Sequence, residues 1–94
     1  MEGTVRYVYD LVKDRTSLAK HGVSLALAAV LFAGPHVSIT DDWFEYGEVR
    51  EVAFGLINDR LFACVYVDRE EERRVISLRK PNRREVERYG DILE

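Results

Sequence analysis

The chain has 94 residues, of which 47% are hydrophobic and 33% charged, and its formal net charge is −3. This composition excludes a disordered polypeptide, and the length suits one domain, residues 1–94, with one modest core. The single cysteine, Cys64, allows no internal disulfide, so we expect a protein of the reducing cytoplasm.

The N-terminal part of the chain predicts a strand and a helix. Residues 5–9 alternate and are rich in valine and tyrosine, which favours a short strand. Asp10 is a suitable N-cap for a helix over residues 11–20, and Gly22 is a suitable left-handed stop. We expect the apolar residues of this helix to face the core: Leu11, Leu18 and Val12.

A second helix is expected over residues 25–33, capped by Ser24 and ended by Gly34 and Pro35. It is apolar on every side, so we expect it to be buried on more than one side. The apolar run that contains it is too short to span a bilayer, and we expect no membrane segment.

The rest of the chain changes to the two-residue period of strands. Four strands are predicted, over residues 37–40, 48–57, 60–68 and 74–80. An acidic, aromatic loop at 41–47 separates the first two, and Asn58-Asp59 is a hairpin turn between the next two. In the third strand one face is expected to carry Phe62, Cys64 and Tyr66, and the other Leu61, Ala63, Val65 and Val67.

The last strand runs into an arginine-rich helix. On the strand we expect Val75, Ser77 and Arg79 on one face and Ile76 and Leu78 on the other. Pro81 breaks the strand, and Asn82 caps a helix over residues 82–92, with Glu85 completing a capping box. Its inward stripe is expected to comprise Val86, Tyr89 and Leu93.

This order of elements predicts an α+β fold. We expect a small, mostly antiparallel sheet with two N-terminal helices and one C-terminal helix. The helices are expected to cover one face of the sheet, which leaves the other face open to solvent or to a ligand.

Positive charge is concentrated near the C-terminus. Residues 73–88 hold seven cations and two acids, a balance of +5 within a chain whose total is −3. Such a local basic patch favours an anion site, and the acidic remainder could meet a basic partner. The simpler structural interpretation is a solvated helix surface with Arg83 and Glu87 as an ion pair.

Two pairs of residues could carry acid–base chemistry. Lys20-His21 joins a cation to the one side chain that titrates near neutrality, although such a histidine is more often a capping or surface residue. Glu48 and Arg50 lie two apart on a predicted strand and therefore share a face. They form either a base beside a phosphate ligand or an ordinary surface ion pair.

A phosphate binder and two aromatic residues complete this inventory. Arg79 can hold a phosphate bidentately, and we predict that it binds the scissile phosphate while His21 or Glu48 moves a proton. Tyr66 and Tyr89 can stack on bases, though both tyrosines also suit the edge of a core. Two histidines and one cysteine have no spacing typical of a zinc or iron site, so we expect no metal and no cofactor. Metal-free RNA cleavage needs this inventory: a base for the 2′-hydroxyl, an acid for the 5′-oxygen, and cations for the phosphorane.

Several short motifs follow each other along residues 7–90. They are Tyr9-Asp10 with Lys13, Lys20-His21-Gly22-Val23, Gly47-Glu48-Val49-Arg50, Arg60-Leu61 with Val65-Tyr66, and Arg74-Val75-Ile76-Ser77-Leu78-Arg79-Lys80 with Arg83-Arg84-Glu85 and Tyr89. In this order they resemble the BrnT family of ribonuclease toxins from bacterial type II toxin–antitoxin pairs. The chain departs from the usual family pattern at Leu11, Ser17, Leu25-Ala26-Leu27, Leu78 and Pro81.

The resemblance implies a fold similar to the RelE-like toxins and a metal-independent endoribonuclease that arrests growth. It also implies a cognate, BrnA-like antitoxin with a DNA-binding domain. The complex would contact operator DNA only through this antitoxin. By the resemblance, the catalytic residues are Lys20, His21, Glu48, Arg50, Arg79 and Lys80. We expect Arg83, Arg84, Tyr66 and Tyr89 to bind the RNA.

Other functions stay open on sequence alone. The chain could be a catalytically silent module that binds its antitoxin as a co-repressor component. A DNA-binding module is less favoured, because no second helix carries base-reading polar residues and the net charge is acidic. An antitoxin could bind the acidic loop at 41–46 or the basic patch, and we favour the basic patch because it would cover the RNA site.

Overall fold

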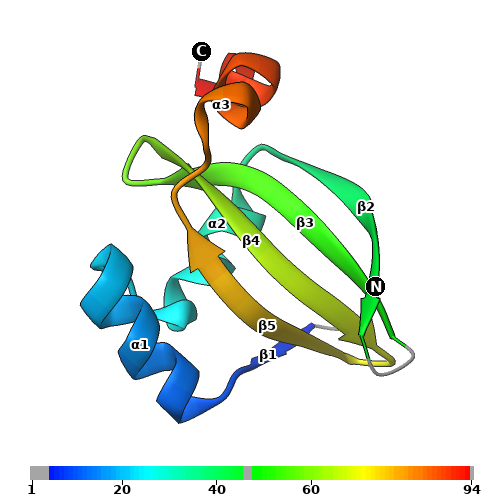
Figure 1. The fold of residues 1–94 in the computed structure, drawn as a ribbon. Helices are drawn as coiled ribbons and strands as arrows, with labels where there is room; N and C mark the ends of the chain where they lie inside the picture. Colours follow the sequence, from blue (N-terminus) through cyan, green and yellow to red (C-terminus); the bar gives the residue numbers. More distant parts are fainter. Residues whose placement is uncertain (1–4, 46–47, 94) are drawn as a thin grey trace.

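The computed structural model describes residues 5–45 and 48–93, and for 41–45, 48 and 93 the backbone only (Figure 1). The elements are β1 (Arg6–Val8), α1 (Leu11–His21), the 3₁₀ turn η1 (Leu25–Leu27), α2 (Ala28–Ala33), β2 (His36–Glu45), β3 (Glu48–Ile57), β4 (Arg60–Arg69), β5 (Glu72–Arg79), α3 (Arg83–Tyr89) and the 3₁₀ turn η2 (Gly90–Leu93). In this part of the chain no single helix is long and apolar enough to cross a membrane, and α1 and α2 reach that length only together, across a bend of 89°.

The strands form one five-stranded sheet in the order β1-β5-β4-β3-β2. β1 runs parallel to β5, and each of the other neighbouring pairs is antiparallel. The predicted α+β fold is therefore confirmed, with a mostly antiparallel sheet, two helices before the long strands and one after them.

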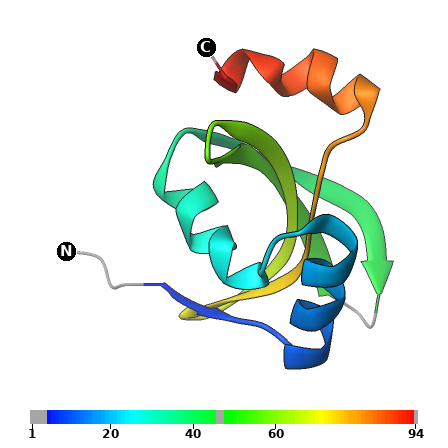
Figure 2. The same ribbon diagram turned by 90° about the vertical axis from the view of Figure 1, so that its left-hand side faces the viewer.

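Helices lie on both faces of this sheet, so the expectation that they would cover only one face was wrong. Figure 2 shows the sheet curving around α2, with α1 beside it and α3 on the far side. Beneath α1 and α2 lies a core that includes Leu25, Ala28, Leu31, Phe62, Cys64 and Leu78. Beneath α3 and η2 lies a smaller cluster of Val52, Phe54, Leu61 and Ala63, covered by Tyr89 and Ile92. The two clusters confirm the predicted alternation of Leu61, Phe62, Ala63 and Cys64 along β4.

Local signals placed the helix ends and the central hairpin correctly. Asp10 caps α1 by accepting from the backbone N–H groups of Val12 and Lys13, and Gly22 closes it at φ 74°. Asn82 and Glu85 form the predicted capping box of α3. The central hairpin turn has positive φ at both residues, Asn58 and Asp59, as a two-residue turn requires.

The orientation of α1 is the reverse of the predicted one. Leu11, Val12 and Leu18 are 67%, 66% and 53% exposed. The buried residue of the helix is Ser17, whose hydroxyl donates to the Val23 carbonyl oxygen at 2.8 Å. On the same side Asp14 accepts from the Ser24 hydroxyl at 2.8 Å and from the Leu25 N–H at 2.7 Å. α1 is therefore held to the following turn by polar contacts, which direct its apolar side outward.

The other two helical segments also bury less than predicted. The segment over residues 25–33 is divided into η1 and α2, and Val30 on its outer side is 49% exposed. In the C-terminal helix Val86 is 42% exposed, whereas Tyr89 stacks on Phe54 with ring centroids 4.2 Å apart. The Leu93 side chain lies outside the described residues.

Two strands differ from the sequence prediction. β2 continues to Glu45, so residues 41–45 are strand and not loop, with an irregular register between Thr40 and Phe44. Tyr46 and Gly47 of that predicted loop lie outside the described residues. β5 contains a bulge, because Val65 pairs with Ser77 while Tyr66 pairs with Val75. The extra residue, Ile76, breaks the alternation and places both Val75 and Leu78 in the helix-covered core. The predicted grouping of Val75 with Ser77 and Arg79 was therefore wrong.

Gly55 marks a close approach of α2 to β3. A Cβ added there would lie 2.8 Å from Leu31 Cγ, and Leu31 is fully buried. We expect Gly55→Ala to lower the free energy of unfolding by about 1–3 kcal/mol, because the core has no space for the methyl group. Urea denaturation measures this change.

Gly34→Ala is the matched control, since a Cβ at Gly34 would meet no atom within 4 Å. Its free energy of unfolding should stay within about 0.5 kcal/mol of the parent value. A Gly55→Ala protein as stable as this control would contradict the close packing of α2 on β3.

Candidate functional site

A cleft of about 230 Å³ lies between α1 and β5. Its walls come from one side of α1, with Lys13, Thr16, Lys20 and His21, and from Ile76–Leu78 of β5. Lys13, Thr16 and Lys20 are spaced three, four and seven residues apart, so consecutive turns of the helix bring them to one side. The cleft therefore gathers two ammonium groups, an imidazole and hydroxyl groups.

The cleft exists because the sheet is incomplete on this side. β1 pairs with β5 only from Glu72 to Arg74, and α1 begins three residues after β1 ends. Beyond Arg74 the outer edge of β5 therefore faces α1 and not another strand. The polar contacts of Asp14 and Ser17 fix the rotation of α1, and so direct Lys13, Lys20 and His21 to this edge.

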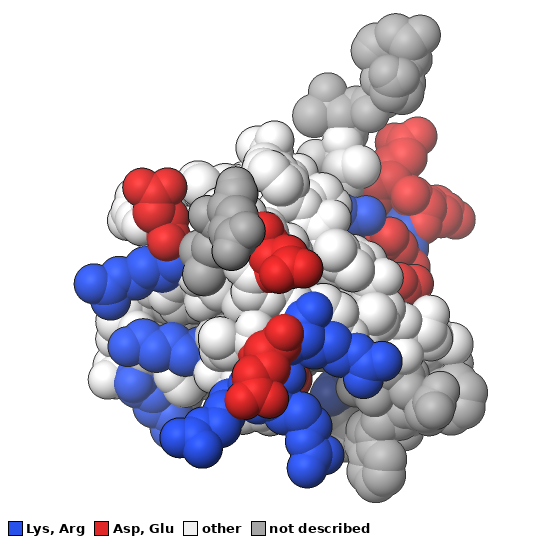
Figure 3. Space-filling model, turned by 90° about the horizontal axis from the view of Figure 1, so that it is seen from above, with Lys and Arg blue, Asp and Glu red and all other residues white. Residues whose placement is uncertain are grey.

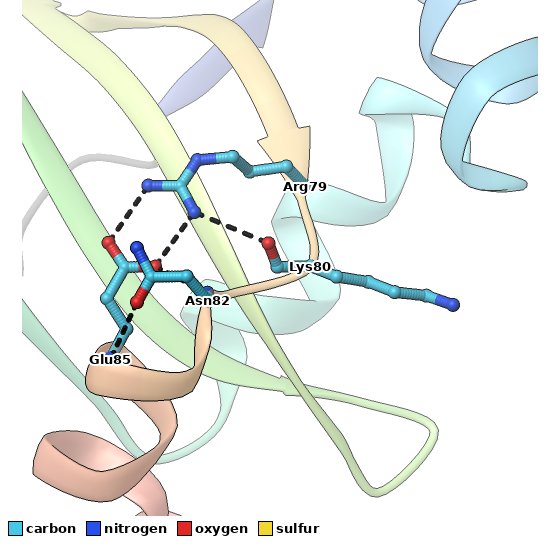
Figure 4. A network of polar contacts seen from close by, with 4 residues as sticks. All are labelled: Arg79, Lys80, Asn82 and Glu85. Atoms are coloured by element: carbon cyan, nitrogen blue, oxygen red, sulfur yellow. Dashed lines mark hydrogen bonds and ion pairs between the residues drawn. The ribbon is translucent and has the colours of Figure 1, made fainter.

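A second polar group lies where β5 ends and α3 begins (Figure 4). The guanidinium of Arg79 donates to both carboxylate oxygens of Glu85, at 2.9 and 3.0 Å, and to the Lys80 carbonyl oxygen at 3.3 Å. This contact lowers the pKa of Glu85 and raises the pKa of Arg79. The Lys80 side chain points away from the pair.

The sheet separates Arg79 from Lys20 and His21. Arg79 pairs with Ala63, whose side chain belongs to the cluster beneath α3, so Arg79 belongs to that face. Alternation from Val52 places Arg50 on the same face, where it is half-buried. The backbone of Glu48 lies in β3, and its side chain lies outside the described residues. The sequence-predicted residues thus form two groups on opposite sides of β5.

The rings of Tyr66 and Tyr89 each pack against another aromatic ring. Tyr66 is 3% exposed, its hydroxyl donates to Ser38 at 2.9 Å, and the Phe32 ring meets it edge-on at 5.0 Å. Burial raises the pKa of Tyr66. Tyr89 is half-buried against Phe54. Neither ring is presented as an open platform for a base.

The basic patch divides into structural and exposed cations. Arg73 pairs with Asp68 at 2.7 and 3.0 Å, and its guanidinium lies 4.4 and 4.6 Å from the centroids of the Phe32 and Tyr66 rings. Arg83 and Arg84 are exposed at the start of α3. Figure 3 looks down on that end of the molecule, where Lys and Arg side chains gather along one margin.

The cleft also contains Lys13, Thr16 and Ser77, which the sequence prediction did not assign to the site. The helical spacing of Lys13 and Thr16 relative to Lys20 indicates that the three share one side of α1. Only the rotation of α1 shows that this side faces β5. Among the described residues, no three His, Cys, Asp or Glu side chains form a group that could hold a metal ion.

The chain matches a known protein family. Residues 9–85 match the family model described as "Ribonuclease toxin, BrnT, of type II toxin-antitoxin system". No curated protein matches the chain significantly. The matched range includes α1, all four long strands and the first residues of α3, and therefore both polar groups.

The Arg79–Glu85 pair predicts a pH dependence of stability. Because the folded protein lowers the pKa of Glu85 below its ordinary value of 4.5, the pair stabilises the fold fully above that value. The stabilisation is lost as the pH falls through the lowered pKa. We expect Glu85→Gln to cost about 0.5–1 kcal/mol at neutral pH and almost nothing in strong acid, measured by urea denaturation across the acid range. Glu87→Gln on the exposed side of α3 is the control, and an equal pH dependence in both variants would contradict the assignment.

Proposed function

The chain belongs to the BrnT family of ribonuclease toxins of type II toxin–antitoxin systems, and from this we propose that it cuts RNA internally, without a metal ion, at the cleft between α1 and β5. Family membership implies an RNA substrate and a cognate antitoxin. We expect the protein to encounter both the RNA and the antitoxin in the cytoplasm.

One observation carries the choice of this cleft: it brings His21 together with Lys13 and Lys20 in a hollow that a phosphate group can enter. In the part of the chain that the structure describes, neither lysine forms an ion pair with a carboxylate. Both ammonium groups are therefore available to hold the non-bridging oxygens of an RNA phosphate.

The proposed reaction needs only groups that the chain supplies. A base takes the proton of the ribose 2′-hydroxyl, and the resulting oxygen attacks the adjacent phosphorus. The bond from phosphorus to the 5′-oxygen breaks, and an acid protonates that oxygen. The products are a 2′,3′-cyclic phosphate and a 5′-hydroxyl. We propose His21 for one of these proton transfers in the cleft. Glu48, the alternative that the sequence offered, lies on β3, whereas the cleft lies between α1 and β5.

The cations on the other side of β5 suit the flanking backbone of the RNA. Arg79 has five N–H donors, and its contacts with Glu85 and the Lys80 carbonyl use three of them. We propose that its remaining donors, together with Arg50, Lys80, Arg83 and Arg84, hold phosphates beside the one that is cut. A BrnA-like, DNA-binding antitoxin would inhibit the toxin by keeping RNA from its site, and operator DNA would be contacted only through the antitoxin.

The first test is RNA cleavage by the purified, antitoxin-free protein in EDTA. We expect the parent to leave cyclic-phosphate ends and His21→Gln to be slower by about 100-fold or more, because proton transfer contributes at that scale. His36→Gln is the matched control, since His36 is exposed and, among the described residues, its ring contacts the Gly34 carbonyl oxygen and the Phe32 ring. Lys20→Ala should also be slower, and Arg79→Ala should be affected less.

Two outcomes would sink this assignment. If His21→Gln cleaves as fast as His36→Gln while both remain folded, the cleft is not the catalytic site. If the folded parent leaves free RNA intact, and also fails to arrest growth when expressed alone, the chain is instead a catalytically silent antitoxin-binding module. Growth arrest without cleavage of free RNA would indicate a toxin that acts only on the ribosome.

A further inference from the structure

The outer side of α1 is apolar. Leu11, Val12 and Leu18 are each more than half exposed. At 100° per residue they lie about 120°, 140° and 100° around the helix from the buried Ser17, so they share one outward arc. Ala19 continues this surface, which surrounds the single cation Arg15. We call Leu11, Val12, Leu18 and Ala19 the outer stripe of α1.

The outer stripe differs from the scattered apolar residues of an ordinary surface. Single exposed leucines are common and need no explanation. Here, however, the polar side of the helix faces the protein and the apolar side faces water, because the hydrogen bonds of Asp14 and Ser17 hold the polar side inward. A helix held by polar groups, with its apolar groups in water, is arranged for a partner.

We propose that the outer stripe of α1 is the anchoring surface for the cognate antitoxin, which lays the apolar side of an acidic, amphipathic segment across it. The proposal rests on the family assignment, which implies such a partner. The charges around the stripe specify the flanks of that segment. Lys13, Lys20 and His21 border it and Arg15 lies within it, while the carboxylate of Asp14 is already engaged inside the molecule. Acidic residues beside the apolar ones would therefore be attracted to both margins.

A second copy of this chain fits the surface less well. Two α1 helices packed through their outer stripes would bring one Arg15 close to the other, with further lysines at the margins. Like charges facing each other oppose such an association. The charge pattern thus selects a partner of opposite sign over self-association.

Anchoring at this surface also gives a route to inhibition. Lys13 and Lys20 lie in the cleft wall on the same helix, beside the outer stripe. An antitoxin segment fixed on the stripe would therefore lie next to the cleft mouth. Its acidic residues would then compete with RNA phosphates for those two lysines.

The test compares antitoxin binding by the parent and by Leu11→Gln/Leu18→Gln, using the antitoxin encoded in the same operon and calorimetry. Glutamine keeps the helix propensity and the charge, and both positions are exposed enough to leave the fold intact. We expect at least about a tenfold rise in Kd, because two apolar contacts are lost. Arg15→Glu should weaken binding as well, and the effect should shrink at high salt.

Val30→Gln is the control, because Val30 is similarly exposed on the other helix. Its Kd should stay within about twofold of the parent value. A double variant that binds as tightly as this control would overturn the proposal. So would a parent that forms a dimer in sedimentation, if the double variant is monomeric and binds the antitoxin normally. RNA cleavage is measured separately on the same antitoxin-free proteins, so a parent without nuclease activity would refute the proposed reaction and leave the binding comparison intact.

Discussion

The contacts of Asp14 and Ser17 with the turn that follows α1 set the arrangement on which the rest of the molecule depends. Asp14 accepts from the Ser24 hydroxyl and the Leu25 N–H, and Ser17 donates to the Val23 carbonyl oxygen. The bond from the Leu25 N–H satisfies a backbone donor that the start of η1 leaves without a helical partner. All three bonds are made in a buried or partly buried environment, where an unpaired group would be costly. They therefore fix not only the position of α1 but also its rotation. That rotation directs the lysines and His21 toward β5 and the leucines toward solvent.

The bulge at Ile76 has the corresponding role on the sheet side of the cleft. With the extra residue, β5 presents both Val75 and Leu78 to the core under the helices, while Ile76 and Ser77 reach the cleft. The same shift leaves Arg79 on the face of α3. There its guanidinium meets Glu85, which also completes the capping box of that helix. The bulge in β5 thus brings Ile76 and Ser77 to the cleft and Arg79 to the C-terminal helix.

The sequence was sufficient wherever a feature depends on neighbours along the chain. Asp10, Gly22 and Asn82 mark helix ends through contacts within a few residues, and the turn at Asn58-Asp59 needs only its own backbone angles. The rotation of α1 was predicted wrongly because the choice between a leucine side and a serine side is made by Val23–Leu25, on a different element. The bulge was missed for a related reason, since an alternating pattern such as Val75–Arg79 contains no sign of the register on β4. Tyr66 shows the same limit: its aromatic ring suits a base, and only the fold reveals that Ser38 and Phe32 already surround it.

The contacts of individual cations distinguish those that serve the fold from those that can bind RNA, which the local excess of arginine alone did not. Two cations of the basic patch serve the fold, because Arg73 is held by Asp68 over two aromatic rings and Arg79 is held by Glu85. A cation already neutralised by a carboxylate gains less from a phosphate than one that meets only water. Lys13 and Lys20, by contrast, form no ion pair within the described residues, and they lie outside the patch by sequence. Lys13 is, however, near enough to the Asp10 carboxylate to help lower its pKa, so Lys20 is the less compensated of the two. The strongest pull on an RNA phosphate should therefore come from α1, the helix that also carries the outer stripe. If so, substrate and antitoxin meet on one short helix, and relief of inhibition requires the antitoxin to leave that helix.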